Sequence, residues 1–258
     1  MGRTPGVNVG GDGIGRAHDD ASLARAIAVG AGKLLVAARH DSLLEGRLLG
    51  DMGDALAQAW IAAVLRRHRP ADAVLSEEAR DTGERLGAER VWIIDPLDGT
   101  REYAAGRDDW AVHIALTVDG VPTDCAVSLP AIDEVFSTED AAIPDEASGR
   151  MVVSRHGLTY ETGWVADRLS LRPYSLGSAG AKAMAVVRGD ADAYVHGMGQ
   201  YEWDNCAPVG VATAAGLHCS RFDGTPLRYN HSRPYVRDFV ICRPEIADRV
   251  LGALDEIY

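Results

Sequence analysis

Two stretches near the start of the chain carry apolar residues at the three- and four-residue spacing of amphipathic helices. Residues 18–39 are predicted to form a first helix, capped by Asp19 or Asp20, and residues 54–70 a second helix that Pro70 ends. The basic run at the end of the second helix suits the negative end of a helix dipole, which favours a solvated terminus over a binding patch. The predicted buried faces comprise Leu23, Ile27, Gly30, Leu34 and Ala38, then Leu56, Trp60, Ala63 and Val64.

Shorter apolar runs follow, and their β-favouring residues and turn signals predict strands. We expect strands at residues 73–79 and 90–95. Residues 110–130 predict a hairpin that turns at Asp119-Gly120, and residues 134–138 predict one more strand.

A second half begins near Met151. Its predicted elements are a helix at 178–189, a strand at 191–196, a helix at 203–216, strands at 217–221 and 238–243, and a closing helix at 244–258. This alternation favours an α/β or layered α+β fold. We therefore divide the chain into an α+β half at 19–150 and an α/β half at 151–258 that form one catalytic unit. Residues 1–18 are predicted to be a flexible tail, since no strand precedes the glycine-rich run "GGDGIG" at 10–15.

Composition narrows the classes of partner. The formal net charge of −12 argues against nucleic acid polymers and anionic membranes. If the substrate is itself anionic, a bound cation is needed to overcome the repulsion locally. The four cysteines form no C-x-x-C pair and are predicted to be buried free thiols. We see no signal peptide and no run of about 18 apolar residues, so we expect a cytoplasmic protein.

The candidate chemistry begins in "WIIDPLDGTREY", residues 92–103, where a buried run leads into Asp95 and, after a Pro-Leu step, into Asp98. Pro96 fixes its φ angle and turns the chain so that the two carboxylates can converge. Clustered carboxylates repel unless a cation lies between them, and such oxygen ligands suit Mg²⁺ or Mn²⁺ rather than zinc. Gly99-Thr100 would then open a helix whose free N–H groups bind an anion. The alternative is an Asp-rich turn that only caps a helix.

Two other stretches offer carboxylates that could join the same metal site. Glu77-Glu78 ends the neighbouring strand and could reach the same metals, although such a pair is more often a solvated face. Asp204, after Trp203, starts a helix in the second half and alone would be read as a cap.

Taken in order, "VLSEEA", "VWIIDPLDGTREY" and "WDNCAPVGVATAAG" resemble the lithium-sensitive, magnesium-dependent inositol monophosphatase superfamily over residues 20–258. Within it, "DGTREY" and "GSAGAKAM" followed by "GDADAYVH" are most similar to the CysQ-type 3'(2'),5'-bisphosphate nucleotidases. The resemblance implies a layered α/β/α/β/α sandwich with the metal site at the seam between the halves. It also implies a role in sulfur assimilation and favours a homodimer.

The resemblance assigns a role to each matching residue. Glu77, Asp95 and the Leu97 carbonyl would hold one Mg²⁺, and Asp95, Asp98 and Asp204 a second. Glu77 would also assist a third, looser Mg²⁺ through water; Mn²⁺ would substitute and Li⁺ would inhibit. Asp54 and Thr100 would orient and deprotonate the attacking water. The implied substrate contacts are the N–H groups of Gly99 and Thr100, then Ser178, Lys182 and His196.

Two departures from the family pattern bear on these roles. This chain has "GRLLGDMGD" where many members carry a lysine and "SPVT", which leaves Asp51 as a rival to Asp54. The acidic residue that holds inositol hydroxyls in inositol phosphatases aligns near Gly197, with Glu202 the only acid close by. We therefore expect hydrolysis of the 3'-phosphate of adenosine 3',5'-bisphosphate to AMP and phosphate. The alternatives are an inositol monophosphatase, a fructose-1,6-bisphosphatase or another biosynthetic phosphatase, and an inactive metal- or nucleotide-binding regulator.

Overall fold

The computed structural model describes residues 19–257, so the predicted tail and its glycine run lie outside the described residues. Seven α-helices are described in this part of the chain: α1 (Asp20–Asp41), α2 (Gly46–His68), α3 (Thr100–Ala104), α4 (Tyr160–Leu169), α5 (Ala179–Val187), α6 (Glu202–Ala214) and α7 (Ala247–Asp255). Short 3-10 turns are η1 (Glu84–Gly87), η2 (Pro130–Ile132) and η3 (Pro244–Ile246).

Two five-stranded sheets form the frame. The first has the order β1-β2-β3-β4-β5, antiparallel except for the parallel β1–β2 pair. Its strands are β1 (Ala73–Ser76), β2 (Arg90–Asp98), β3 (Ala111–Val118), β4 (Val121–Leu129) and β5 (Glu134–Ser137). The second has the order β10-β12-β8-β6-β7 and is mixed. Its strands are β6 (Arg150–Ser154), β7 (Arg172–Leu176), β8 (Ala193–His196), β10 (His218–Ser220) and β12 (Phe239–Cys242). The pair β9 (Gln200–Tyr201) and β11 (Tyr235–Val236) forms a small third sheet.

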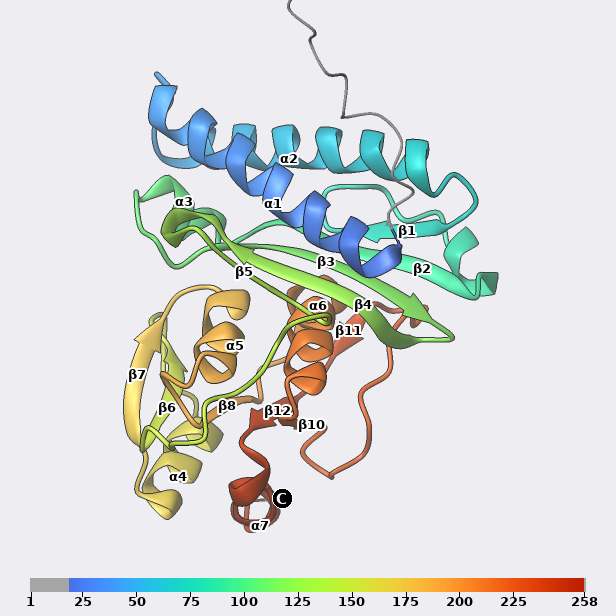
Figure 1. Cartoon of the computed structure of the whole chain (residues 1–258). Coiled ribbons are helices and arrows are strands. Elements are labelled where there is room, and N and C mark those ends of the chain that lie inside the picture. Colours follow the sequence, from blue (N-terminus) through green and yellow to red (C-terminus); the bar gives the residue numbers. More distant parts are fainter. Residues whose placement is uncertain (1–18, 258) are drawn as a thin grey trace, which may run out of the picture.

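The helices lie in three layers around the two sheets (Figure 1). α1 and α2 cover the outer face of the first sheet, α5 and α6 lie between the sheets, and α4 and α7 cover the far face of the second. The predicted α/β/α/β/α sandwich is therefore confirmed.

Both faces of the first sheet are buried, and this explains why its strands read as continuous apolar runs. On β2, Trp92 and Ile94 pack towards α1 and α2, whereas Val91 and Ile93 belong to the core shared with α5 and α6. Alternate residues thus serve two separate cores. The hairpin prediction is confirmed, because Asp119 and Gly120 both adopt positive φ angles between β3 and β4.

The first two helices differ in detail from the prediction. α1 begins after Asp19, whose side chain accepts a hydrogen bond from Ser22 N at 2.8 Å, as predicted. α2, however, begins at Gly46, eight residues before the predicted start. The predicted buried faces are also wrong in part, because α1 and α2 pack on each other as well as on the sheet. Gly30 faces the Trp60 ring, and the face of α2 that meets the sheet is Gly53, Ala57, Ile61 and Leu65.

Three elements between residues 150 and 176 had no sequence-based prediction, namely β6, α4 and β7. The predicted strand at 73–79 ends at Ser76, which places Glu77-Glu78 in a turn.

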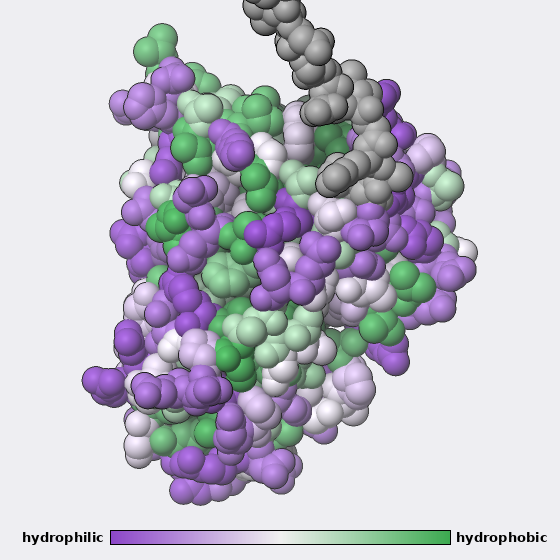
Figure 2. Space-filling view, in the orientation of Figure 1, coloured by the Kyte–Doolittle hydropathy of each residue, from purple (hydrophilic) through white to green (hydrophobic). Residues whose placement is uncertain are grey.

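By length and composition, α1 and α2 would each suffice to cross a membrane. Here they act as core helices, since their buried residues pack against the first sheet. On the face shown in Figure 2, hydrophilic side chains are interspersed with hydrophobic ones over these outer helices.

Candidate metal centre and active site

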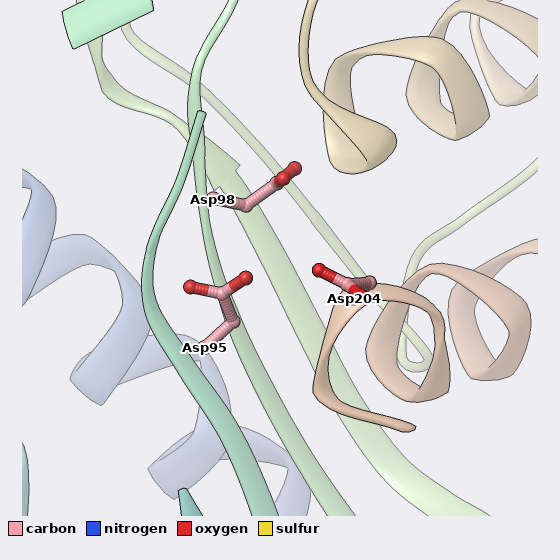
Figure 3. A group of neighbouring side chains, drawn as sticks. All are labelled: Asp95, Asp98 and Asp204. Atoms are coloured by element: carbon pink, nitrogen blue, oxygen red, sulfur yellow. The ribbon is translucent and has the colours of Figure 1, made fainter. Parts of the chain in front are cut away.

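Asp95 and Asp98 point to the same side of β2 because the strand is irregular between them. In a regular strand, residues three positions apart face opposite sides. Here Asp95 pairs with His113 and Asp98 with Ala111, and the register shifts in between. Leu97 packs into the outer core with α1 and α2, while the two carboxylates face the space between the sheets (Figure 3). The Pro96-Leu97 step thus converges the two groups, as the sequence predicts.

The third carboxylate comes from the second half of the chain. Asp204 lies in the first turn of α6, where its Oδ2 accepts a hydrogen bond from Tyr201 N at 2.8 Å. One oxygen from each of Asp95, Asp98 and Asp204 lies within 4.8 Å of the others (Figure 3). Asp204 can therefore cap α6 and also offer an oxygen to a metal ion from the same position.

This cluster is electrostatically unbalanced on the Asp95 side. Burial, followed by the charges of Glu77, Asp98 and Asp204, raises the pKa of Asp95 well above its usual range. Burial and the Asp98 charge also raise the pKa of Asp204 to about 7. An all-oxygen set of crowded carboxylates fits a hard divalent cation, which would allow these groups to ionise together.

Glu77 lies at the mouth of this cluster. The residue is exposed to water, yet protein crowds its carboxylate, which shares a hydrogen bond with Asp95. Desolvation and the charges of Asp54 and Glu78 raise the pKa of Glu77 to about 7. Glu77 therefore lies beside Asp95, and its role as a metal ligand stays a prediction.

Asp98 has a different environment. Its oxygens accept hydrogen bonds from Ala179 N at 3.2 Å and Gly180 N at 2.6 Å, at the start of α5. Although burial acts to raise the pKa of Asp98, His113, Gly180 N and the Ser178 side chain together hold it below its usual range.

His113 is a site residue that sequence reasoning missed. Its Nε2 lies 3.2 Å from Asp98 Oδ2, and its Nδ1 lies 3.1 Å from the carbonyl oxygen of Trp203. This fully buried side chain thus links Asp98 of the first half to the residue before Asp204. The sequence feature that could have indicated His113 is its place as a lone histidine within the apolar strand run "WAVHIAL".

Asp54, and not Asp51, reaches the threonine of the motif. Thr100 Oγ1 lies 3.4 Å from Asp54 Oδ2 and 3.2 Å from the carbonyl oxygen of Leu97, whereas Asp51 is exposed. Burial and the Glu78 charge raise the pKa of Asp54 to about 7.

Glycines of α2 allow this close approach. A Cβ atom on Gly50 would lie 2.6 Å from Thr100 Cγ2, and one on Gly53 would lie 3.0 Å from Leu97 Cδ2. The "GDMGD" run that departs from the family pattern therefore lets α2 carry Asp54 up to the motif.

Gly99 allows the chain to turn from β2 into α3. Its φ angle is +88°, and an added Cβ would lie 2.8 Å from Ser178 Cβ. Ser178 is the N-cap of α5, where its hydroxyl accepts a hydrogen bond from Ala181 N at 3.0 Å. Gly99 and Ser178, both predicted to contact substrate, are thus side by side.

Lys182 is buried, and its Nζ donates a hydrogen bond to the Gly177 carbonyl at 3.2 Å and lies over the Tyr194 ring. Desolvation lowers its pKa, although the nearby charges of Asp98 and Glu102 act in the opposite direction. His196 stacks on Phe239, and its Nε2 lies 3.1 Å from the Gly199 carbonyl. Burial lowers the pKa of His196 to about 4, so it is neutral at pH 7.

Comparison with known proteins identifies the family. Residues 48–257 match the model of the inositol monophosphatase family. The chain is 49% identical to the 3'-phosphoadenosine 5'-phosphate phosphatase of Mycobacterium leprae, over 93% of this chain and 94% of that protein. It is 30% identical to the 3'(2'),5'-bisphosphate nucleotidase CysQ of Escherichia coli K12, over 68% and 77% of the two chains.

A similar structure is that of CysQ from Bacteroides thetaiotaomicron, described as a bacterial member of the inositol monophosphatase family. Its TM-score is 0.74 at 25% identity, with 86% of this chain and 96% of that chain covered. The fold, the ordered carboxylates and the match over most of the chain lead to one conclusion: this protein belongs to the inositol monophosphatase family.

Proposed function

We propose that this protein hydrolyses the 3'-phosphate of adenosine 3',5'-bisphosphate and releases AMP and phosphate. The observation that carries the proposal is the convergence of Asp95, Asp98 and Asp204, in a chain 49% identical to a relative named for that activity. Crowding these carboxylates together destabilises a fold unless a cation balances them.

The proposed cation is Mg²⁺, for which Mn²⁺ would substitute. Glu77, Asp95 and the Leu97 carbonyl would hold one ion, and Asp95, Asp98 and Asp204 a second, with Glu77 assisting a third. When bound, these ions supply Lewis acidity that polarises phosphoryl oxygens and lowers the pKa of water. Inhibition by Li⁺ follows from family membership alone.

Asp54 and Thr100 are the proposed proton-handling pair. The raised pKa of Asp54, about 7, suits a group that accepts a proton near neutral pH. The Thr100 hydroxyl lies between Asp54 and the Leu97 carbonyl, so it can orient a water molecule at the side of the cluster where Asp95 lies.

Substrate selection is assigned to the start of α3, to the start and first turn of α5, and to the end of β8. The N–H groups of Gly99 and Thr100 would hold the scissile phosphate. Ser178, Lys182 and His196 would contact the rest of the nucleotide. Glu202 is fully buried and accepts hydrogen bonds from Asn230 N and His231 N, so it is not available to bind inositol hydroxyls. This supports a nucleotide over an inositol phosphate.

The test is a panel of phosphate esters assayed for phosphate release with Mg²⁺ and, in parallel, with EDTA. The panel contains adenosine 3',5'-bisphosphate, inositol 1-phosphate, fructose 1,6-bisphosphate and 4-nitrophenyl phosphate. We expect the nucleotide to have the highest kcat/KM and EDTA to abolish its hydrolysis.

A higher kcat/KM for a sugar phosphate would overturn the substrate assignment. Absence of metal-dependent hydrolysis across the panel would favour an inactive binding protein. Cytoplasmic location and homodimer formation stay predictions.

A further inference from the structure

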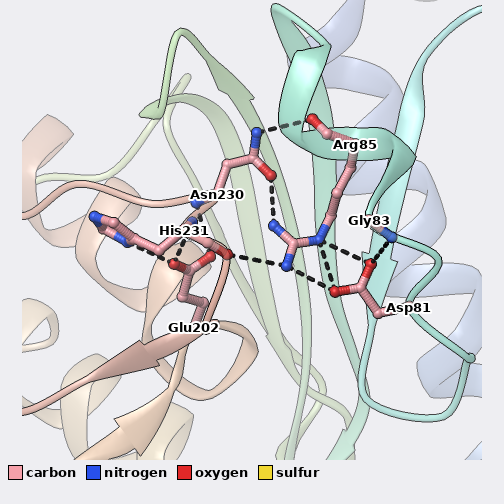
Figure 4. A network of polar contacts seen from close by, with 6 residues as sticks. All are labelled: Asp81, Gly83, Arg85, Glu202, Asn230 and His231. Carbon is pink, nitrogen blue, oxygen red and sulfur yellow. Dashed lines mark hydrogen bonds and ion pairs between the residues drawn. The ribbon is translucent and has the colours of Figure 1, made fainter.

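A buried arginine lies where two segments that are distant in the sequence meet (Figure 4). Arg85, in η1, donates from Nη1 to Asn230 Oδ1 at 2.6 Å and from Nη2 to the His231 carbonyl at 3.0 Å. Asp81 accepts from Arg85 Nη2 at 2.8 Å and balances its charge. Asn230 returns a hydrogen bond from Nδ2 to the Arg85 carbonyl at 3.0 Å. Arg85 therefore fixes the backbone and the side chain of the 230–231 segment together.

The same segment holds the start of α6. Asn230 has a φ angle of +65°, and the consecutive N–H groups of Asn230 and His231 both donate to Glu202, at 2.7 and 2.9 Å (Figure 4). His231 Nδ1 also lies 2.7 Å from Glu202 Oε1. Glu202 has no exposed surface, so these donors are what make its buried carboxylate tolerable.

The position of this chain of contacts suggests its use. Glu202 precedes Asp204 by two residues in the first turn of α6. Arg85 lies between β1, after which Glu77 follows, and β2, which carries Asp95. The contacts therefore join the β1–β2 connection to the start of α6. Glu77 and Asp95 flank this connection in the first half, and α6 supplies Asp204 from the second half.

We propose that Arg85 is a positioning residue for the metal centre: through Asn230 and Glu202, it fixes the start of α6 and thereby holds Asp204 opposite Asp95. The proposal rests on the proposed function, since it requires that the cluster binds divalent cations. Cation affinity depends on ligand oxygens being held at the correct separation before the ion arrives.

A residue that only stabilises the fold would behave differently. Arg243 supplies a matched control, because it is also buried and donates to backbone carbonyls, those of Pro144 at 2.7 Å and Asp145 at 2.9 Å. None of its described contacts involves α6 or the β1–β2 connection. Arg243→Met should therefore lower stability without changing cation affinity.

The experiment measures Mn²⁺ binding to EDTA-stripped full-length protein, by the electron paramagnetic resonance signal of free Mn²⁺ and without substrate. The Mg²⁺ concentration for half-maximal activity is measured in parallel. We expect Arg85→Met to raise both values by roughly tenfold. Arg243→Met should leave both within about twofold of the parent protein. Arg85→Lys, which keeps the charge but not the forked geometry, should fall between them.

Asn230→Gly keeps the experiment decisive if Arg85→Met fails to fold. Glycine adopts the positive φ angle and keeps the N–H that donates a hydrogen bond to Glu202. The hydrogen bond from Arg85 Nη1 to the Asn230 side chain is lost. We expect a several-fold rise in the Mn²⁺ dissociation constant for this variant.

The positioning role would be overturned if Mn²⁺ affinity were unchanged in Asn230→Gly and also unchanged in an Arg85 variant that folds, whether Arg85→Met or Arg85→Lys. This outcome would leave the proposed function intact. A parent protein that binds no Mn²⁺ and needs no Mg²⁺ would instead overturn the proposed function, and this proposal with it.

Discussion

Asp95 and Asp98 are three residues apart on one strand and both are buried, yet their surroundings shift their pKa values in opposite directions. Asp95 is surrounded by carboxylates, which together with burial raise its pKa well above the usual range. Asp98 is surrounded by donors, the N–H groups of α5 and the imidazole of His113, and its pKa is lowered. The fold itself balances the charge of Asp98, whereas Asp95 accepts a hydrogen bond from Leu97 N at 3.0 Å but has no cationic partner among the contacts of the described residues.

This difference divides the site into two parts. On the Asp98 side, polar contacts connect the two halves of the chain and hold the geometry without a cation. On the Asp95 side, Glu77, Asp54 and Asp204 add charge that is useful only when a cation is bound. We therefore infer that the Asp98 side preorganises the centre and that the Asp95 side supplies most of its affinity for metal.

The largest effect should come from Asp95→Asn compared with Asp98→Asn. Asp95→Asn should lower kcat by roughly 1,000-fold or more, since bound metal supplies several kcal/mol of stabilisation to the transition state. In EDTA, however, its melting temperature should stay unchanged or rise, because the amide removes a buried carboxyl group whose ionisation the surrounding carboxylates oppose. Asp98→Asn should lower metal-free stability by about 1–3 kcal/mol, because the buried donors lose a charged acceptor. Thermal unfolding of both variants in EDTA measures these stabilities. A destabilised Asp95→Asn together with an unchanged Asp98→Asn would contradict the difference between the two aspartates.

The next effect concerns the water on the Asp95 side. Thr100→Ala and Asp54→Asn should each lower kcat by about 100-fold and leave KM nearly unchanged, because they act on the nucleophile. The double variant should be scarcely slower than either single variant, since the two groups act as one unit. Asp51→Asn is the matched control and should retain activity, as its side chain is exposed. Additive losses for Thr100 and Asp54 would show that they are not coupled.

Lys182 tests substrate choice near Asp98. Lys182→Met should raise KM for adenosine 3',5'-bisphosphate by roughly tenfold, since a charge-assisted hydrogen bond contributes about 1.5–3 kcal/mol. The loss of kcat/KM for 4-nitrophenyl phosphate should be smaller, because that ester has no second phosphate. The exposed Lys33, replaced by Met, serves as the control. Equal losses for both esters would favour a general sugar phosphatase.

The smallest effect concerns pH and stability without metal. Asp54, Glu77 and Asp204 have folded-state pKa values of about 7, raised from the ordinary values of 3.8 for aspartate and 4.5 for glutamate. The folded state therefore holds more protons than the unfolded state in this window, so stability should fall as pH rises from about 4.5 to 7. Asp98 contributes with the opposite sign, but only near and below pH 3.8. We expect the melting temperature in EDTA to fall by a few degrees across the window and Mg²⁺ to suppress the fall. A rise with pH in EDTA would contradict these shifts.

The sequence was sufficient for the parts of the site that depend on local chain chemistry. The run from Asp95 to Thr100 contains its own turn residues, so the strand irregularity and the start of α3 could be predicted from Pro96 and Gly99. The position of Asp204 at the start of α6 followed from the order of the motifs, although its contact with Asp95 could not be derived from local pattern. The family resemblance supplied that link, together with the layered fold.

Other features could not be predicted because they depend on contacts between distant segments. The face of α2 that meets the sheet was misassigned because Trp60 packs on α1, a choice that helical periodicity alone does not determine. His113 and Arg85 sit in ordinary strand and turn sequences. The partners that give them their roles lie in distant segments, namely Trp203 in α6 for His113 and the 230–231 segment for Arg85. Only the folded arrangement reveals what they hold.

The most direct test of the central claim is anomalous diffraction at the manganese edge from crystals of this protein grown with Mn²⁺. We predict two peaks about 3.5–4 Å apart, both in contact with Asp95. Asp98 and Asp204 should contact only one of them. Asp95→Asn crystals grown in the same way should lose at least one peak. A single peak bound by Asp98 without Asp95, or no peak at this cluster, would contradict the account.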